Sequence, residues 1–427
     1  MFNKYDAYKD SCEGWIGLIP NHWEVVKLKH LFTEKKHKKN MSLSSGSISF
    51  GDVVYKDDEK ITEATKASYQ EVLKGEFLLN PLNLNYDLIS LRIALSKINV
   101  VVSAGYIVLL ANNLVYKEYF KYLLHRYDVA YMKLLGSGVR QTISFNHIAN
   151  SLLPYPSMLE QKNIAEFLDQ KTSEIDQAIA IKEQQIALLN ERKQIVIQKA
   201  VTQGLNPNVP MKDSGVEWIG RIPEHWDLLK LKNLALVNPT NTTLVNSLDK
   251  KAAVCFLAME SVETNGTVDY SHTRELASVR SGFTSFVKGD VLVAKITPCF
   301  ENGKGAYLDT LQTPIGFGST EFHVLRVKKN CDPKFLYYVT KSHSFMDMGE
   351  GLMIGSAGQK RVPTSFMQNY IVAIPDIATQ IEIVNFIDQR LGEIAEAIDL
   401  QKKQIEKLKE YKTTLINDAV TGKIKVA

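Results

Sequence analysis

Two long stretches of the chain repeat apolar residues every seven positions, which is the spacing of a helix that packs along another helix. The first stretch, residues 157–203, contains neither glycine nor proline and is rich in strong helix formers, so we predict one helix of about forty residues. Prolines just before it and Gly204 just after it mark its ends. The stripe consists of Leu168, Ile175, Ile179, Ile186, Leu189 and Val196 in the first stretch, and of Ile387, Leu391, Ile394, Ile398, Ile405, Leu408 and Leu415 in the second.

Polar residues interrupt both stripes at matching positions, which are Lys182 and Lys193 in the first and Gln401 and Lys412 in the second. An apolar stripe this narrow needs a partner helix, and the chain supplies one with the same register. We therefore predict that the helices pair as an intramolecular antiparallel coiled coil with pseudo-twofold symmetry. The alternative is that each stripe packs on the globular domain next to it. Gly392 should weaken the second helix by up to about 1 kcal/mol.

A repeat organises the whole chain. Fourteen of twenty-three positions are identical between residues 9–31 and 212–234, which include a Trp-Ile-Gly-x-Ile-Pro-x-His-Trp block in each copy. A second pair of similar segments begins at Gln161 and Gln380 and runs to an Ala-Val-Thr sequence at the end of each helical stretch. We predict that the tryptophans of the first block anchor each copy in its core. His22 and His225 have no second ligand at metal-binding spacing, so we expect no metal there.

The segments between these repeated flanks, residues 32–155 and 235–374, differ almost everywhere but keep a faint common frame. Each has a Lys-Gly-acidic tripeptide before an apolar run, at residues 74–76 and 288–290. Each also has a Gly/Ser loop with a basic residue before Phe145 or Phe366. One scaffold therefore presents two different surfaces, which is typical of a protein that makes two distinct recognitions.

Side chains suited to base edges and phosphates gather in the loops of both segments. Arginine can bond guanine in two places and asparagine or glutamine can do so for adenine, while lysine, serine and threonine contact the backbone. The candidates in the second segment are Lys295, Thr297, Asn302, Lys304, Gln359, Lys360 and Arg361. Those in the first segment are Asn80, Asn83, Asn85, Arg92, Ser137, Arg140 and Gln141.

Composition narrows the class of protein. Apolar residues make up 45% and charged residues 23%, as in globular domains, and the net charge of +4 is only a weak indication of a nucleic-acid partner. The four cysteines have no C-x-x-C spacing, which argues against zinc and disulfides and favours a reducing cytoplasm. Because the start lacks an apolar signal core and no apolar run is long enough for a bilayer, we expect no membrane partner.

Motifs for chemistry are missing from the sequence. No phosphate-binding G-x-x-x-x-G-K-[ST] occurs, and no glycine-rich nucleotide loop follows an expected strand. The Asn80-Pro81-Leu82-Asn83 run lacks the second proline and the aromatic residue of the amino-methyltransferase block. We therefore expect a non-catalytic chain, with no cofactor or metal of its own.

Taken together, these motifs resemble the specificity subunit of a type I restriction–modification system. The resemblance covers essentially the whole chain and includes the tryptophan block, the Lys-Gly-acidic turn, the Gly/Ser loop and a P-x-x-x-x-Q-x-x-I motif before each long helix. That last motif is Pro156, Gln161 and Ile164 in the first copy and Pro375, Gln380 and Ile383 in the second.

The resemblance implies an α+β fold with two tandem mixed α/β target-recognition domains, separated by the two long paired helices. We expect domain 1 at residues 1–155, spacer helix 1 at 156–204, a linker with domain 2 at 205–374, and spacer helix 2 with the tail at 375–427. It further implies that each domain reads one half of a bipartite, asymmetric site in double-stranded DNA. The helices would set the gap between the halves and dock two modification subunits, which bind S-adenosylmethionine. Restriction subunits, which use ATP and Mg²⁺, would join that core.

A second class of function stays open from the sequence alone. A coiled coil between two unlike domains also suits a protein–protein adaptor that never contacts DNA. A self-sufficient methyltransferase is disfavoured by the missing motifs.

Overall fold

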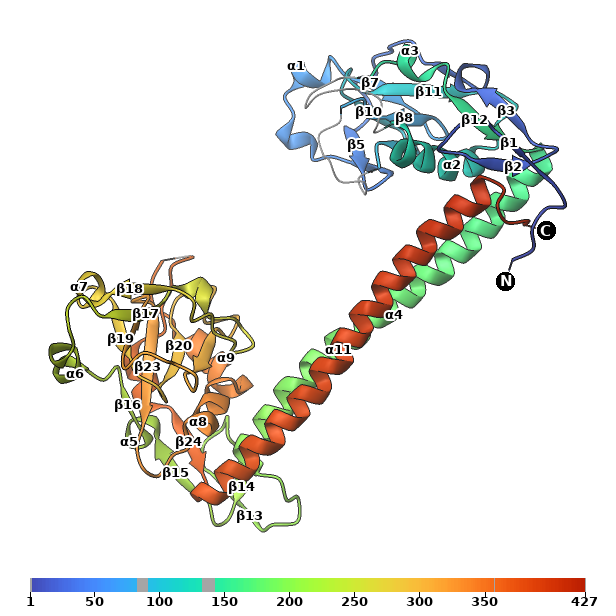
Figure 1. The fold of residues 1–427 in the computed structure, drawn as a ribbon. Coiled ribbons are helices and arrows are strands. Elements are labelled where there is room, and N and C mark those ends of the chain that lie inside the picture. The colour runs from blue at the N-terminus through green and yellow to red at the C-terminus, as the bar shows by residue number, and fades with distance from the viewer. Residues whose placement is uncertain (1, 83–90, 133–142, 357, 427) are drawn as a thin grey trace. The chain divides into compact units, whose positions relative to one another are not determined.

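The computed structural model describes residues 2–82, 91–132, 143–356 and 358–426, which form two compact units (Figure 1). Unit 1 consists of Met1–Lys182 and Lys403–Ala427, and unit 2 of Glu183–Lys402. Each unit therefore contains part of both long helices, α4 (Met158–Gln203) and α11 (Ile377–Val420). The helices fall inside the spacer ranges expected from the sequence, but each helix is divided between the two units.

The remaining helices and strands of unit 1 precede α4. The strands are β1 (Tyr8–Asp10), β2 (Leu18–Pro20), β3 (Glu24–Lys27), β4 (Phe32–Glu34), β5 (Gly46–Ser49), β6 (Asp52–Tyr55), β7 (Gln70–Val72), β8 (Phe77–Leu79), β9 (Ile93–Leu95), β10 (Val100–Val102), β11 (Ile107–Ala111) and β12 (Leu152–Tyr155). The helices are η1 (Leu28–His30), η2 (Asp58–Lys60), α1 (Glu63–Lys66), α2 (Lys117–Ala130) and α3 (Phe145–Ile148).

The remaining strands and helices of unit 2 lie between α4 and α11 in the chain. Its strands are β13 (Met211–Asp213), β14 (Arg221–Pro223), β15 (Asp227–Lys230), β16 (Ala235–Val237), β17 (Ala253–Leu257), β18 (Thr273–Glu275), β19 (Thr284–Phe286), β20 (Val291–Ala294), β21 (Gly305–Tyr307), β22 (Gly316–Gly318), β23 (Phe322–Val327) and β24 (Ile371–Ile374). Its helices are α5 (Leu231–Leu234), α6 (Thr242–Ser247), η4 (Met259–Ser261), α7 (Leu276–Val279), α8 (Pro333–Thr340), α9 (His343–Gly351) and α10 (Thr364–Asn369).

The two units share one sheet frame. Unit 1 has an antiparallel sheet in the order β4-β11-β8-β9, and unit 2 has the corresponding order β16-β23-β20-β21. Two-stranded ladders, β3 with β12 and β15 with β24, precede α4 and α11 in the same way. Unit 2 also has a mixed sheet, β18-β17-β22-β19, in which β17 and β22 are parallel. Unit 1 has the corresponding antiparallel ladders β5-β6 and β7-β10, which a parallel bridge between Ser45 and Val101 joins. The faint frame in the sequence therefore reflects an architecture that both units share.

The Lys-Gly-acidic tripeptides form equivalent turns before β8 and β20. Gly75 and Gly289 have φ of +85° and +91°, which glycine adopts without the steric cost of a Cβ atom. The acidic residue then closes the turn, because Glu76 accepts a bond from the Leu73 amide at 2.9 Å and Asp290 accepts one from the Val287 amide at 2.8 Å.

The repeated tryptophan blocks lie in the cores, as predicted. Trp23 and Trp226 are 0% and 1% exposed. Each packs in the same apolar cluster as the final turns of a long helix, Trp23 with Val420 at the end of α11 and Trp226 with Val201 near the end of α4. Each cluster thus joins the start of a copy to the helix that ends on it.

The glutamines that are repeated in the two copies also have a structural role. Gln161 and Gln380 are both fully buried, and each side-chain amide donates to the carbonyl of the proline five residues earlier, at 3.0 and 2.8 Å. Each side-chain oxygen accepts a backbone N–H from the chain before α2 or α8, from Tyr116 and Asp332. The P-x-x-x-x-Q motif therefore fixes the start of the long helix against its own domain.

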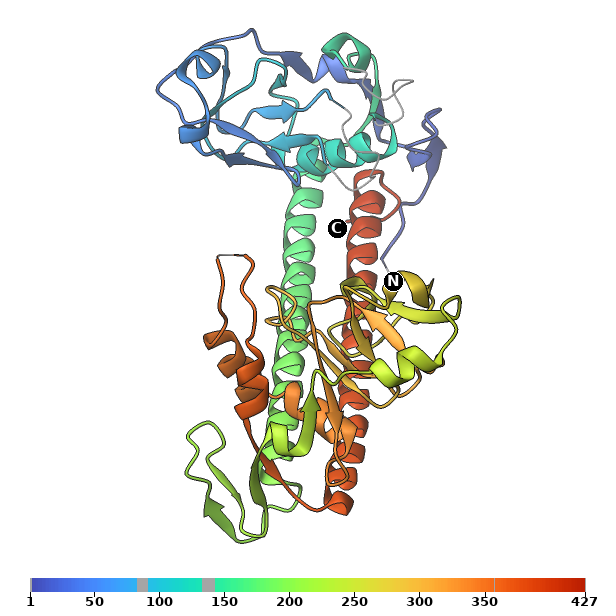
Figure 2. The ribbon, with the colours of Figure 1, turned by 90° about the vertical axis from the view of Figure 1, so that its left-hand side faces the viewer.

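The helices α4 and α11 run side by side and antiparallel (Figures 1 and 2). Within unit 1, Asp176 of α4 pairs with Lys412 of α11 at 2.7 Å, and Lys182 of α4 bonds Gln404 of α11. Higher residue numbers in α4 therefore lie beside lower residue numbers in α11, as antiparallel helices require. Every predicted stripe residue is buried or half-buried. Near the start of each helix the stripe residues also pack in a domain core, as Leu168 and Ile387 do. The stripes therefore pack both on the other helix and on the neighbouring domain. The α11 helix continues through Gly392.

Candidate nucleic-acid interface

The two loops of unit 2 that were singled out in the sequence lie against each other. The Thr297 amide donates to the Lys360 carbonyl at 3.0 Å, and the Lys360 amide donates to the Thr297 hydroxyl at 3.2 Å. The Val362 amide donates to the Lys295 carbonyl at 2.8 Å. Backbone pairing therefore brings residues more than sixty positions apart onto one surface.

Arg361 is the most firmly held side chain of this surface. Its backbone bridges to Ile296 on one side and Ile354 on the other. Its guanidinium grips the Glu321 carboxylate in two places, from Nε at 2.9 Å and from Nη2 at 3.0 Å. The Arg361 side chain nevertheless stays 46% exposed.

Lys295 lies beside this ion pair. Burial lowers the pKa of Lys295, the carboxylate of Glu321 partly offsets that effect, and the charge of Arg361 adds to the lowering. The positive charges of Lys295 and Arg361 and the negative charge of Glu321 sum to one net positive charge on this part of the surface. Lys360, which is exposed, adds a second one.

The other predicted residues of unit 2 divide into exposed and engaged groups. Asn302 and Gln359 are exposed. Lys304 instead donates to the carbonyl of Met259 at 3.0 Å and is partly buried. Its ammonium therefore ties the loop to η4, and this internal bond competes with any contact to a ligand.

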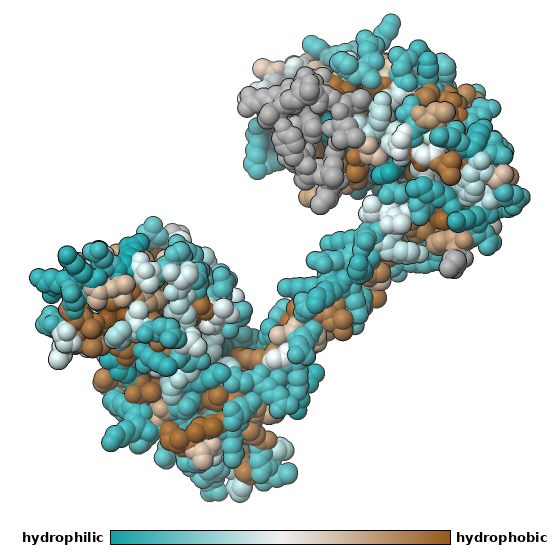
Figure 3. Space-filling view, viewed as in Figure 1, coloured by the Kyte–Doolittle hydropathy of each residue, from teal (hydrophilic) through white to brown (hydrophobic). Residues whose placement is uncertain are grey.

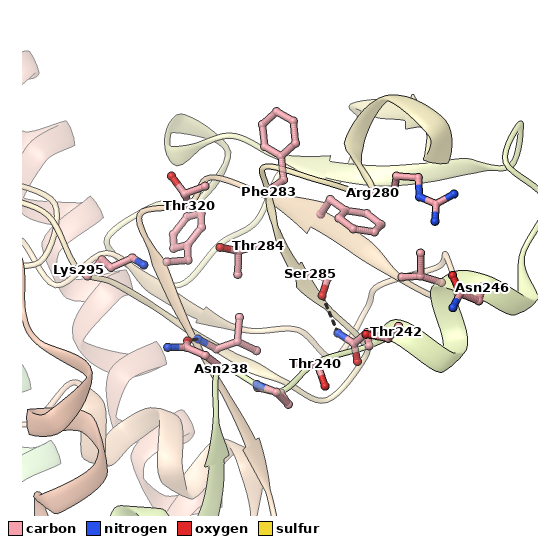
Figure 4. Close-up of a pocket in the computed structure, with 16 residues that line it drawn as sticks. Asn238, Thr240, Thr242, Asn246, Arg280, Phe283, Thr284, Ser285, Lys295 and Thr320 are labelled. Atoms are coloured by element: carbon pink, nitrogen blue, oxygen red, sulfur yellow. Dashed lines mark hydrogen bonds between the residues drawn. The ribbon is translucent and has the colours of Figure 1, made fainter.

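A polar groove of about 550 Å³ opens next to Lys295 (Figure 4). Lys295 lies at one end and Asn246 and Arg280 at the other. The walls carry hydroxyl and amide side chains together with the half-exposed ring of Phe283. Sequence reasoning singled out only Lys295 among the lining residues, although the polar Asn238–Thr243 run directly after β16 was a usable signal.

Some of the polar groups in this groove have internal partners. The amide of Asn241 donates to the Ser285 hydroxyl at 2.9 Å, and its oxygen accepts a bond from Arg326. Asn238 bonds the Val324 amide and the ring of His323. These contacts shape the groove, and the basic groups at its two ends give it a charge that suits a polyanion.

The candidates of unit 1 are placed less completely. Asn83, Asn85, Ser137, Arg140 and Gln141 lie outside the described residues. The side chain of Asn80 accepts the Leu82 amide at 3.1 Å and so closes a local turn.

Arg92 lies in the interior rather than on the surface that the sequence suggested. Its side chain is 6% exposed and its Nε donates to Asp128, which is fully buried, at 3.0 Å. The Arg92 amide donates to the other oxygen of the same carboxylate at 2.6 Å. Because Arg92 directly precedes β9, which packs beside α2, tertiary packing buries it, and a DNA contact would require this ion pair to open.

The helices leave part of their surface unpartnered within unit 2. Leu188 and Ile195 of α4 are 64% and 45% exposed, and Ile195 lines a hollow of about 560 Å³ with Gln198 and His343. Figure 3 shows hydrophobic residues scattered over the mostly hydrophilic surface of the paired helices.

Two kinds of feature are missing from the part of the chain that the structure describes. No group of three or more His, Cys, Asp or Glu residues is placed to hold a metal ion. None of the described helices has the length and apolarity to cross a membrane.

A family model described as the type I restriction modification DNA specificity domain matches residues 20–191 and again residues 223–410. These ranges cover most of the chain and correspond to its two copies. The chain therefore belongs to the type I restriction modification DNA specificity domain family.

Individual relatives agree with this assignment. The chain is 36% identical over 167 residues to the type I restriction enzyme EcoEI specificity subunit of Escherichia coli, a match that covers 38% of this chain and 27% of that protein. It is 33% identical over 231 residues to the EcoAI specificity subunit of the same organism, covering 51% of this chain and 38% of that protein. The match to the MjaVIII specificity subunit of Methanocaldococcus jannaschii, at 23% identity, covers 96% of this chain and 94% of that protein.

Solved structures share the fold. The HsdS subunit from Thermoanaerobacter tengcongensis aligns over 97% of this chain and 100% of its own, with a TM-score of 0.54 and 14% identity. A chain from a structure of complex assembly and conformational transition in the type I R-M system aligns over 94% of this chain and 98% of its own, with a TM-score of 0.66 and 13% identity.

Proposed function

We propose that this chain is a non-catalytic, sequence-specific DNA-recognition subunit in which each unit reads one half of a bipartite, asymmetric target. The observation that carries the proposal is the surface of unit 2, where backbone pairing gathers Lys295, Lys360 and Arg361 beside a polar groove. Exposed lysines suit phosphates, and a fixed arginine suits a base edge. The family and its relatives support the same function.

We infer the partners from the family and from the exposed apolar residues of the helices. Two modification subunits, which bind S-adenosylmethionine, would dock on the helices, and restriction subunits that use ATP and Mg²⁺ would join them in the cytoplasm. The exposed Leu188 and Ile195 of α4 offer a place for such docking. Leu188→Glu with Ile195→Glu should reduce co-purification of the modification subunit without changing duplex binding. Leu236→Glu, at a residue 49% exposed on β16, serves as the control.

Binding of the full-length chain to random duplex DNA at several salt concentrations tests the proposal. A steep fall of affinity with salt is expected, because each phosphate contact releases condensed counterions. Lys360→Ala should lower the salt slope by about one if Lys360 contacts a phosphate. Binding that does not respond to salt, together with retained binding of protein partners, would instead support a protein–protein adaptor.

Exchange of residues 32–155 for the corresponding segment of another family member tests whether each unit recognises its own half-site independently. Methyl-specific sequencing of host DNA should then show one altered half-site and one unchanged half-site. A change in both halves would contradict the assignment of one half to each unit.

A further inference from the structure

Glu321 and Arg361 form an ion pair on the candidate interface, and the backbone of both residues is held in place. Glu321 lies in the turn before β23, where its amide donates to the Ser319 hydroxyl at 3.2 Å and its carbonyl accepts the Lys295 amide at 2.9 Å. The backbone of Arg361 is fixed from both sides by Ile296 and Ile354. Both partners of the ion pair are therefore held by main-chain bonds.

The geometry of the pair leaves a defined set of donors. An arginine has five N–H donors in a planar fork. Nε and Nη2 each give one to the carboxylate of Glu321, and Nη1 gives one to the Gln359 carbonyl at 3.2 Å. One N–H remains on each of the two Nη nitrogens, and these neighbouring donors match the two acceptors, N7 and O6, that guanine presents in the major groove.

The charge of the pair also favours a base over a phosphate. A carboxylate in contact with the guanidinium compensates its charge and repels a phosphate at the same place. The neighbouring Lys360 is exposed and pairs with no carboxylate of the described residues, so it suits the phosphate backbone better. Since the fork is ordered before any ligand arrives, less side-chain entropy is lost when it binds.

We propose that Glu321 is a positioning residue that aims Arg361 at one guanine of the half-site read by unit 2. This inference rests on the proposed DNA recognition and assigns one base and one supporting residue within it. Neither a free arginine nor a lysine at position 361 would offer the same fixed pair of donors.

The test is selection from a random duplex library by the full-length chain assembled with its modification subunit, followed by sequencing of the bound DNA. Wild-type protein should select a bipartite motif with a guanine in the half-site of unit 2. Glu321→Gln and Arg361→Lys should each lower the preference at that single position by about tenfold or more, and leave the other positions unchanged.

Glu301→Gln is the matched control, because Glu301 is an exposed acid in the loop that carries Lys295. It removes the same charge, so it should raise affinity for random duplex as Glu321→Gln does, but without changing any base preference. Circular dichroism and thermal unfolding of all variants separate loss of fold from loss of recognition.

The outcomes that overturn the inference are distinct from those that overturn the function. If the wild type selects a motif and both substitutions leave every base preference intact, Glu321 only holds Arg361 in place for the fold and the inference is wrong. If Arg361→Lys and Arg361→Ala weaken all sequences equally, Arg361 contacts a phosphate. If the wild type selects no motif, the proposed DNA recognition fails and the inference fails with it.

Discussion

Replacing Gly422 by alanine tests how tightly the turn after α11 packs on the first residues of the chain. It has φ of +73°, and a Cβ atom there would lie 2.4 Å from Cδ of Pro20 and 3.1 Å from the Trp23 ring. Neither neighbour can retreat easily, because proline is rigid and Trp23 is fully buried. Gly422→Ala should therefore separate the C-terminal turn from the start of the chain.

The expected loss has two parts. A left-handed backbone costs alanine about 1–2 kcal/mol, and overpacking against Pro20 costs about 1–3 kcal/mol more. The control is Gly17→Ala, because Gly17 has φ of +75° with nothing within 4 Å of the added carbon, so only the backbone cost of about 1–2 kcal/mol applies. Gly204→Ala, at the matching end of α4, should fall between them, since its Cβ lies 3.1 Å from the Trp226 ring.

Urea unfolding combined with hydrogen exchange of peptides from residues 3–27 and 415–424 measures the effect. Gly422→Ala should lower the free energy of unfolding more than Gly17→Ala and speed exchange in both peptides. Equal losses for the two variants would refute the close packing of Gly422 on Pro20.

Three further outcomes follow from the described contacts. Ile398→Ala, at 8% exposure in α11, should lower the free energy of unfolding by about 2–4 kcal/mol, whereas Leu400→Ala, at 55% exposure on the same helix, should change it by under about 0.5; equal effects in urea unfolding would argue against the paired helices. Asp290→Asn removes the carboxylate that Arg326 grips at 2.8 Å from both Nε and Nη2 and should destabilise unit 2 by about 3 kcal/mol, so an unchanged urea midpoint would rule out that role. Burial lowers the pKa of His323 to about 4 from its ordinary 6.5, so the folded protein favours the neutral ring. The free energy of unfolding should therefore be highest above pH 6.5 and should fall by roughly 3 kcal/mol as the pH decreases to about 4. His323→Gln should flatten this slope in denaturation curves recorded across that pH range.

Much of the architecture was predictable because its causes are local or repeated. The lack of glycine and proline between residues 157 and 203 predicts a long helix, and the structure begins it at Met158 and ends it at Gln203. The stripe residues are buried because an apolar face must be covered wherever it lies. The duplicated tryptophan block and Lys-Gly-acidic turn identify two copies of one frame from the sequence alone.

The candidate site was predictable only in part. The sequence indicated which loops of unit 2 carry the polar residues, and the structure brings those loops together. The sequence did not indicate that Lys304 bonds Met259, that Arg92 is buried against Asp128, or that Glu321 holds Arg361. No local pattern distinguishes an arginine that will be buried from one that will stay exposed. Assignments within the DNA contact set remain predictions.

The sequence by itself determined the duplication, the two helices and the two dissimilar surfaces, because periodicity and repetition are properties of neighbouring residues. Only the tertiary structure decided which side chain is free to meet a ligand. Glu321 and Arg361 are forty residues apart in the chain, and their contact depends on a turn, a bridge to Ile296 and the strand β23 all being in place. Such contacts arise when folding closes long loops, and the energies that choose among them come from burial and charge across the whole unit.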